Sequence, residues 1–154
     1  FSLADLTMIK SSQFSNYNVF KSSNPVNLSC DINGNMDKII EVLFDNIVIQ
    51  SDHLNAKTNG TYQATIPAGD PRLTHGTHTA EFRLYQAFAK NGEFVKSNEI
   101  DPIKVEIAVC QDGDARPIIW CGDYQEVYRT YDDIQIPFKV NGLKIRLYPL
   151  KSEI

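Results

Sequence analysis

The stretch Val26-Asn27-Leu28-Ser29-Cys30-Asp31-Ile32 indicates the fold class, because apolar and polar residues alternate along it. Successive side chains of a β-strand point to opposite faces, so this alternation gives a strand one buried face and one polar face. Asn33-Gly34-Asn35 follows directly and is typical of a turn. The stretch therefore predicts a half-buried β-strand that ends in a turn.

The same period of two continues along the chain to Val109. Tight turns are expected at Asp45-Asn46 and at Asn91-Gly92, since Asn-Gly is the strongest short hairpin signal. Pro102 predicts a bulge or a sheet edge. About seven strands over roughly 95 residues are typical of an all-β, immunoglobulin-like β-sandwich with Greek-key connections. We expect its core to contain Val26, Leu28, Cys30, Ile32, Val42, Phe44, Ala64, Ile66, Phe82, Leu84, Val105 and Ile107.

The composition of the 154 residues is that of a folded chain with a modest acidic charge. Hydrophobic residues make up 42%, which is enough for a core, and charged residues make up 22%. The formal net charge of -4, without a basic stripe, argues against a nucleic-acid partner. The sequence has no apolar run approaching about 18 residues, so membrane insertion is not expected. A first residue of Phe rather than Met predicts a processed form or a piece of a longer chain.

Two segments of the chain resemble each other at an offset of 108 residues (127 minus 19). Val19-Phe20-Lys21-Ser22 aligns with Val127-Tyr128-Arg129-Thr130, and Ile32-Asn33-Gly34 aligns with Val140-Asn141-Gly142. Alternation alone often produces such matches, but the shared polar identities are harder to obtain by chance. The offset is about the length of one sandwich domain. The pattern predicts an internal repeat.

The repeat divides the chain into four parts: a leading segment (1–15), an immunoglobulin-like sandwich (16–109), a linker (110–117) and the start of a second, incomplete repeat (118–154). In the second copy we expect Ile134, Ile136, Phe138 and Val140 to face inward. A few strands bury too little apolar area to be stable alone. A continuation or a neighbouring chain is therefore expected to cover this part, and the sequence leaves open which one completes it.

The three cysteines do not form a disulfide framework. Cys30 lies in an alternating run and aligns with Phe138, so a buried, reduced thiol is expected. Cys110 and Cys121 flank a short segment, and whether they pair stays open.

The residue types that carry chemistry do not form a recognisable site. His75 and His78 are three apart, which places them on opposite faces of a strand, and His53 stands alone in a polar stretch. Asp112-Gly113-Asp114 resembles the start of a calcium loop, but the later ligands do not follow, so a linker is the better interpretation. Asp132-Asp133 are adjacent and predict a turn rather than an acid–base pair. We therefore expect no enzyme activity, no catalytic residue, no cofactor and no metal.

The segment Leu73-Thr74-His75-Gly76-Thr77-His78 resembles the entry into the sixth strand of bacterial and phage immunoglobulin-like and fibronectin-type repeats. The resemblance implies that His78 bonds back to the backbone, as in a tyrosine corner. The strand that follows contains no Cys, which separates the chain from the disulfide-linked antibody type. Tyr131 to Phe138 resembles the opening of tandem modules in phage tail-fibre, baseplate and other virion proteins.

The resemblance implies a structural or interaction module in an extended multi-domain assembly: a phage virion component of the tail fibre, baseplate or head decoration. Its expected partners are other protein chains, in an oligomer, and a host-surface glycan or protein. The alternative is a bacterial cell-surface adhesin or carbohydrate-binding module, located outside the cell. Glycan binding favours grouped aromatic side chains, for which Tyr124, Tyr128 and Tyr131 are the candidates, whereas Trp120 is expected at the domain junction.

Overall fold

A computed structural model describes residues 6–121 without 11–17, and residues 138–141; for 119–121 and 138–141 it describes the backbone alone. The described elements are all β-strands. They are β1 (Thr7–Lys10), β2 (Asn18–Lys21), β3 (Val26–Asn33), β4 (Lys38–Phe44), β5 (Ile47–Leu54), β6 (Gly60–Ile66), β7 (Gly76–Lys90), β8 (Glu93–Glu99), β9 (Ile103–Cys110), β10 (Ile118–Cys121) and β11 (Phe138–Asn141).

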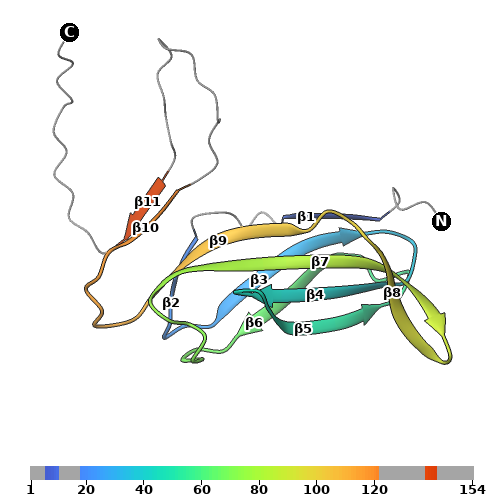
Figure 1. Cartoon of the computed structure of the whole chain (residues 1–154), viewed down its shortest axis with the longest axis horizontal. Coiled ribbons are helices and arrows are strands. Elements are labelled where there is room, and N and C mark those ends of the chain that lie inside the picture. The colour runs from blue at the N-terminus through green and yellow to red at the C-terminus, as the bar shows by residue number, and fades with distance from the viewer. Residues whose placement is uncertain (1–5, 11–17, 122–137, 142–154) are drawn as a thin grey trace, which may run out of the picture.

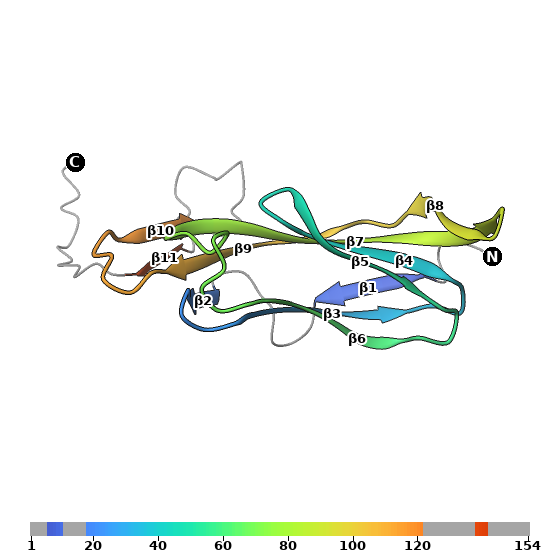
Figure 2. The same cartoon turned by 90° about the horizontal axis from the view of Figure 1, so that it is seen from below.

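Strands β1 to β9 form two sheets that pack face to face (Figures 1 and 2). The smaller sheet has the order β1-β3-β6, and the larger has the order β2-β9-β7-β4-β5, with β8 paired to β7. The chain changes sheet at β1–β2, β2–β3, β3–β4, β5–β6 and β6–β7, and these crossovers between sheets are typical of Greek-key sandwiches. The predicted immunoglobulin-like β-sandwich is confirmed.

The space between the sheets is filled by the residues on the apolar phase of the alternating strands. All twelve predicted core residues are at most 2% exposed, which confirms the predicted register. Three further core residues lie outside the strands: Leu6, Met36 and Leu73. They close the ends of the sandwich and have no alternating pattern around them, so the sequence did not single them out.

The sandwich begins earlier than the predicted boundary at residue 16. Strand β1 pairs antiparallel with β3, with Thr7 opposite Asn33 and Lys10 opposite Cys30. Leu6 is buried and Met8 packs against the core. The predicted leading segment therefore supplies a strand, which a four-residue run is too short to reveal by periodicity.

Both predicted tight turns carry the left-handed backbone that two-residue hairpins require. The φ values are 49° and 66° at Asp45 and Asn46, and 53° and 80° at Asn91 and Gly92. Pro102 lies in the break between β8 and β9, directly before Ile103, and both strands pair with β7. The predicted hairpins are confirmed, and Pro102 interrupts the returning strand as predicted.

The chain enters and leaves the sandwich at opposite ends. We call the end with the β7–β8 turn the hairpin end, and the end where β9 finishes the junction end (Figure 1). Strand β1 starts at the hairpin end, where Thr7 lies opposite Asn33. At the junction end the Ser22 N–H donates to the carbonyl of Cys110, 2.9 Å away. The start of β1 and the end of β9 therefore lie at opposite ends of the sandwich.

Beyond the sandwich, β10 and β11 form an antiparallel pair with Ile118 opposite Asn141 and Cys121 opposite Phe138. Ile134, Ile136, Asp132-Asp133 and the three candidate tyrosines lie outside the described residues, as does the side chain of Trp120. The repeat therefore stays a prediction. Within the described ranges no helix is long and apolar enough to span a membrane.

Candidate interaction surfaces

His78 on β7 ties the corner before its own strand to the β4–β5 turn. Its Nε2 lies 2.6 Å from the carbonyl oxygen of Thr74, and its Nδ1 lies 2.5 Å from Oδ2 of Asp45. The ring stacks on Phe44 with centroids 4.9 Å apart. Asp45 also accepts from the Thr79 N–H. The backbone bond implied by the resemblance is present, and His78 is a buried structural residue.

His75 has different partners from His78 and contacts the segment that follows the sandwich. Its Nδ1 accepts from the Gln111 N–H at 3.1 Å, so its Nε2 carries the proton and donates to the carbonyl of Arg116 at 2.7 Å. The side chain is 4% exposed. The two histidines therefore hold two different loops and do not converge on a common site.

Asp114, from the calcium-like triplet, is bound by an arginine. Arg116 Nη2 donates to Oδ2 at 2.6 Å, and Arg116 Nε donates to Oδ1 at 3.0 Å. This fork lowers the pKa of the Asp114 carboxyl well below its usual value. Within the described ranges no group of three or more His, Cys, Asp or Glu side chains lies close enough to hold a metal ion.

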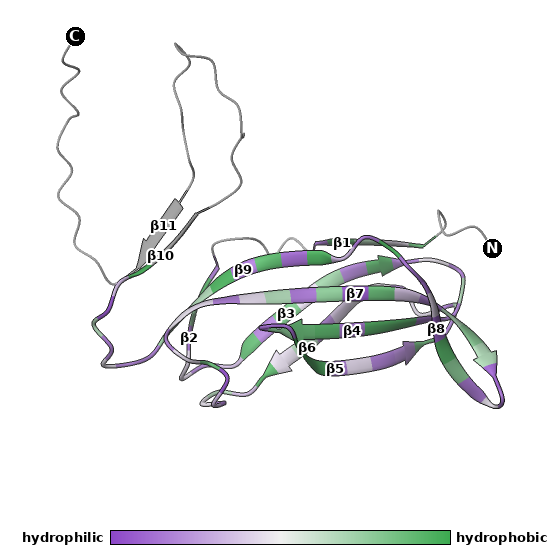
Figure 3. Cartoon of the chain, viewed as in Figure 1, coloured by the Kyte–Doolittle hydropathy of each residue, from purple (hydrophilic) through white to green (hydrophobic). Residues whose placement is uncertain are grey.

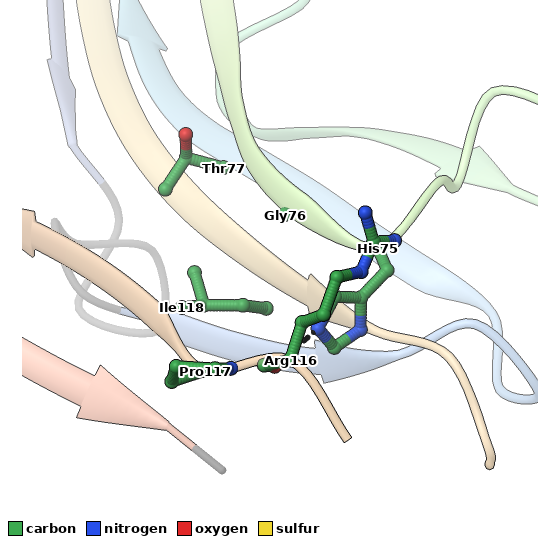
Figure 4. A pocket seen from close by; sticks show the side chains of 6 residues that line it. All are labelled: His75, Gly76, Thr77, Arg116, Pro117 and Ile118. Atoms are coloured by element: carbon green, nitrogen blue, oxygen red, sulfur yellow. Dashed lines mark hydrogen bonds between the residues drawn. The ribbon is translucent and has the colours of Figure 1, made fainter. Parts of the chain in front are cut away.

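A small pocket of about 250 Å³ lies between the start of β7 and the segment after β9 (Figure 4). Its lining residues are His75, Gly76, Thr77, Arg116, Pro117 and Ile118. Ile118 is buried and packs with Ala108 of β9, with Cys110 beside them. These contacts make a second apolar cluster, separate from the sandwich core, which attaches the predicted linker to the sandwich.

Lys38 at the hairpin end is a fully buried lysine that the sequence analysis did not single out. Its Nζ donates to the carbonyls of Gly34 at 2.8 Å and Met36 at 3.2 Å, and more weakly to Asn55 O and Asn59 Oδ1. Burial lowers the pKa of Lys38, while the nearby Asp37 carboxylate opposes the shift. The ammonium group therefore joins the two loops at this end. No pattern marks such a lysine, because strand alternation does not identify acceptors on other loops.

The β7–β8 hairpin extends past the rest of the larger sheet. Pairing between β7 and β4 stops at Gln86, whereas pairing between β7 and β8 continues to Lys90 opposite Glu93. Figure 3 shows hydrophobic residues in both arms of this overhang. Phe88 lies on the same strand phase as core residues Phe82 and Leu84, yet it is 49% exposed.

Side-chain contacts hold the overhanging hairpin to the sheet. His53 stacks on Phe94 with ring centroids 3.9 Å apart and also contacts Asp37 at 3.1 Å. Lys96 Nζ lies 3.1 Å from Glu41 and 4.9 Å from the centre of the Tyr85 ring. His53 thus lies on strand β5 and has two partners, so the expectation that it stands alone is wrong. These contacts hold the hairpin, and with it the exposed Phe88, in a fixed position relative to the sheet.

Strands β5 and β6 are linked across the open side of the sandwich by a polar cluster. The Tyr62 hydroxyl donates to Asp52, and Gln50 Nε2 donates to the Tyr62 oxygen at 2.6 Å. Burial raises the pKa of the Tyr62 hydroxyl. The cluster joins the edge of one sheet to the edge of the other and so has a structural role.

Cys30 is fully buried in the core as predicted, and burial raises its pKa to about 12. Cys110 is half-buried, and burial raises its pKa too, with Lys21 opposing the shift. The side chain of Cys121 lies outside the described residues. Pairing of Cys110 with Cys121 therefore stays open.

Comparison with known proteins adds a structural likeness. The fibronectin(III)-like modules of Clostridium thermocellum CbhA are similar to 68% of this chain, over 98% of their own, with 17% sequence identity and a TM-score of 0.42. No protein-family model and no curated protein matches the chain. The strand pairing itself defines the class: an all-β sandwich of the immunoglobulin and fibronectin type III kind.

Proposed function

We propose that this chain is a non-catalytic structural and interaction module of an extended multi-domain assembly, and specifically a phage virion component of the tail fibre, baseplate or head decoration. The observation that carries the proposal is the placement of the two connections at opposite ends of the sandwich. Modules connected in this way can be joined end to end, so that each one adds its length to the assembly.

The overhanging hairpin supports a role in contact with other protein chains. A half-exposed aromatic residue on a firmly supported ribbon loses little conformational entropy on binding. Phe88 lies opposite Val95 on the same face of the hairpin, and this face points past the edge of the core. Aromatic anchors of this kind are common at the centre of protein–protein interfaces.

The histidines and the buried lysine support a structural role for the polar groups. His53, His75 and His78 each contact an acid, a carbonyl or an aromatic ring of the fold. Lys38 is engaged by backbone carbonyls. These contacts stabilise loops, and the proposal assigns them no part in chemistry.

Mass spectrometry of purified phage particles and of host-cell envelopes from the same source tests the proposal. We expect peptides of this chain to co-purify with capsid and tail proteins through a density gradient. Recovery of the chain in the envelope fraction alone would overturn the virion assignment and favour the adhesin alternative.

A further inference from the structure

The segment that leaves the sandwich, residues 110–118, is attached to it along its length. We call this segment the connector. Its first part is a tight turn in which the Asp114 N–H donates to the carbonyl of Gln111 at 3.2 Å, with Gly113 at a φ of 84°. Its last residue, Ile118, is buried against Ala108. A free linker would have neither an apolar anchor nor a closed turn.

His75 supplies the central attachment of the connector. One ring nitrogen accepts from the Gln111 N–H and the other donates to the carbonyl of Arg116, so a single buried ring spans the turn. Gln111 Nε2 adds a bond to the carbonyl of Leu73 at 3.3 Å. All of these bonds cross from the corner before β7 to the connector, as Figure 4 shows for the His75–Arg116 pair.

Asp114 and Arg116 of the connector satisfy each other. Asp114 accepts from the backbone N–H of Arg116 at 3.0 Å and from its guanidinium group. Asp114 Oδ1 also lies 3.7 Å from His75 Nε2. The turn therefore keeps its shape through its own ion pair, while His75 attaches it to the sandwich.

We infer that the connector is a rigid joint, positioned by His75, which fixes the direction in which the chain leaves the sandwich toward β10. A rigid joint fixes the orientation of the segment that follows it relative to the sandwich, whereas a flexible linker leaves that orientation free. The inference concerns described residues alone, so it stands or fails independently of the proposed function.

Backbone ¹⁵N relaxation and amide exchange on the whole chain test the joint. We expect order parameters of about 0.85 for residues 111–117, matching the strands, whereas a flexible linker would give values below about 0.6. In His75→Ala the Gln111 amide should exchange about tenfold faster, because it loses its acceptor. His75→Gln keeps an N–H for the Arg116 carbonyl and is expected to keep part of the order.

His53→Ala is the matched control, since His53 is also bonded but lies at the hairpin end and should leave Gln111 exchange unchanged. Order parameters below about 0.6 across the connector of the unmodified chain would overturn the inference. Unchanged Gln111 exchange in His75→Ala would overturn it as well. If His75→Ala disturbs the signals of the β4 core, the order parameters of residues 111–117 and the exchange rate of the Gln111 amide are measured in His75→Gln instead, and these two values decide the question.

Discussion

Lys38 is the residue whose placement distinguishes this sandwich most clearly from an ordinary apolar core. Lys38 is the first residue of β4, at a position where the alternation would place another aliphatic side chain. The carbonyl of Gly34 is 2.8 Å away and that of Met36 is 3.2 Å away. The energetic value of the residue lies in its bonds to these buried acceptors.

Replacing Lys38 by Met is expected to lower the free energy of unfolding by about 1–3 kcal/mol, because buried carbonyls lose their donor. Chemical denaturation of both proteins measures the difference. Lys90→Met, at an exposed lysine on the hairpin, is the control and should change stability by less than about 0.5 kcal/mol. A Lys38→Met protein as stable as the parent would contradict the role given to the ammonium group.

The lowered pKa of Lys38 also predicts a dependence on pH. Between its folded pKa and the ordinary value of 10.5, the unfolded chain binds more protons at this residue than the folded chain does. Lys38 therefore makes the folded state more stable as the pH rises through that window. The stability gap between the parent and Lys38→Met should widen from neutral pH toward 10.5, and a constant gap would refute the shift.

Cys30 is expected to be unreactive in the folded chain, because the attacking species is the thiolate and the pKa of this thiol is raised to about 12. Titration with a thiol reagent should label Cys30 only after denaturant is added, with peptide mapping to separate it from the other two cysteines. Labelling of Cys30 in the native protein at the rate of a model thiol would show that the strand register is wrong.

At the scale of elements, the β7–β8 hairpin depends on its Asn91-Gly92 turn. Gly92 has a φ of 80°, a conformation that disfavours any side chain. Gly92→Ala should therefore cost about 1 kcal/mol and weaken pairing in the overhang before it affects the rest of β7. Amide exchange should accelerate at Phe94 and Val95 but not in β3. Equal acceleration in both places would show that the hairpin is not a separate unit.

The elements show which features a sequence can reveal. Alternation predicted β3, β4, β6, β7 and β9 and their buried faces, because a half-buried strand has a period of two. It could not reveal β1, which is too short, nor the connector, whose attachment depends on His75, 41 residues away from Arg116 in sequence. Lys38 was missed for the same reason, since its acceptors lie on loops with no pattern of their own.

At the scale of the whole molecule, the exposed side chains at the hairpin end should contribute to the binding of a partner and little to the stability of the fold. Phe88→Ser removes a half-exposed ring and is expected to change stability by less than about 1 kcal/mol. Phe82→Ala, at a fully buried position on the same strand phase, should cost about 3–5 kcal/mol. Thermal unfolding of both variants provides the comparison. A large loss of stability in Phe88→Ser would place this ring in the core and remove it as a contact residue.

Cross-linking mass spectrometry on intact purified particles tests most directly the claim that this chain is a module held by other proteins in an assembly. Lys90 at the hairpin tip is exposed and suits an amine-reactive reagent. The account predicts cross-links from Lys90 to a lysine of a different protein chain, reduced in Phe88→Ser particles. Particles that contain the chain but give cross-links from Lys90 only to residues of the same chain would contradict it.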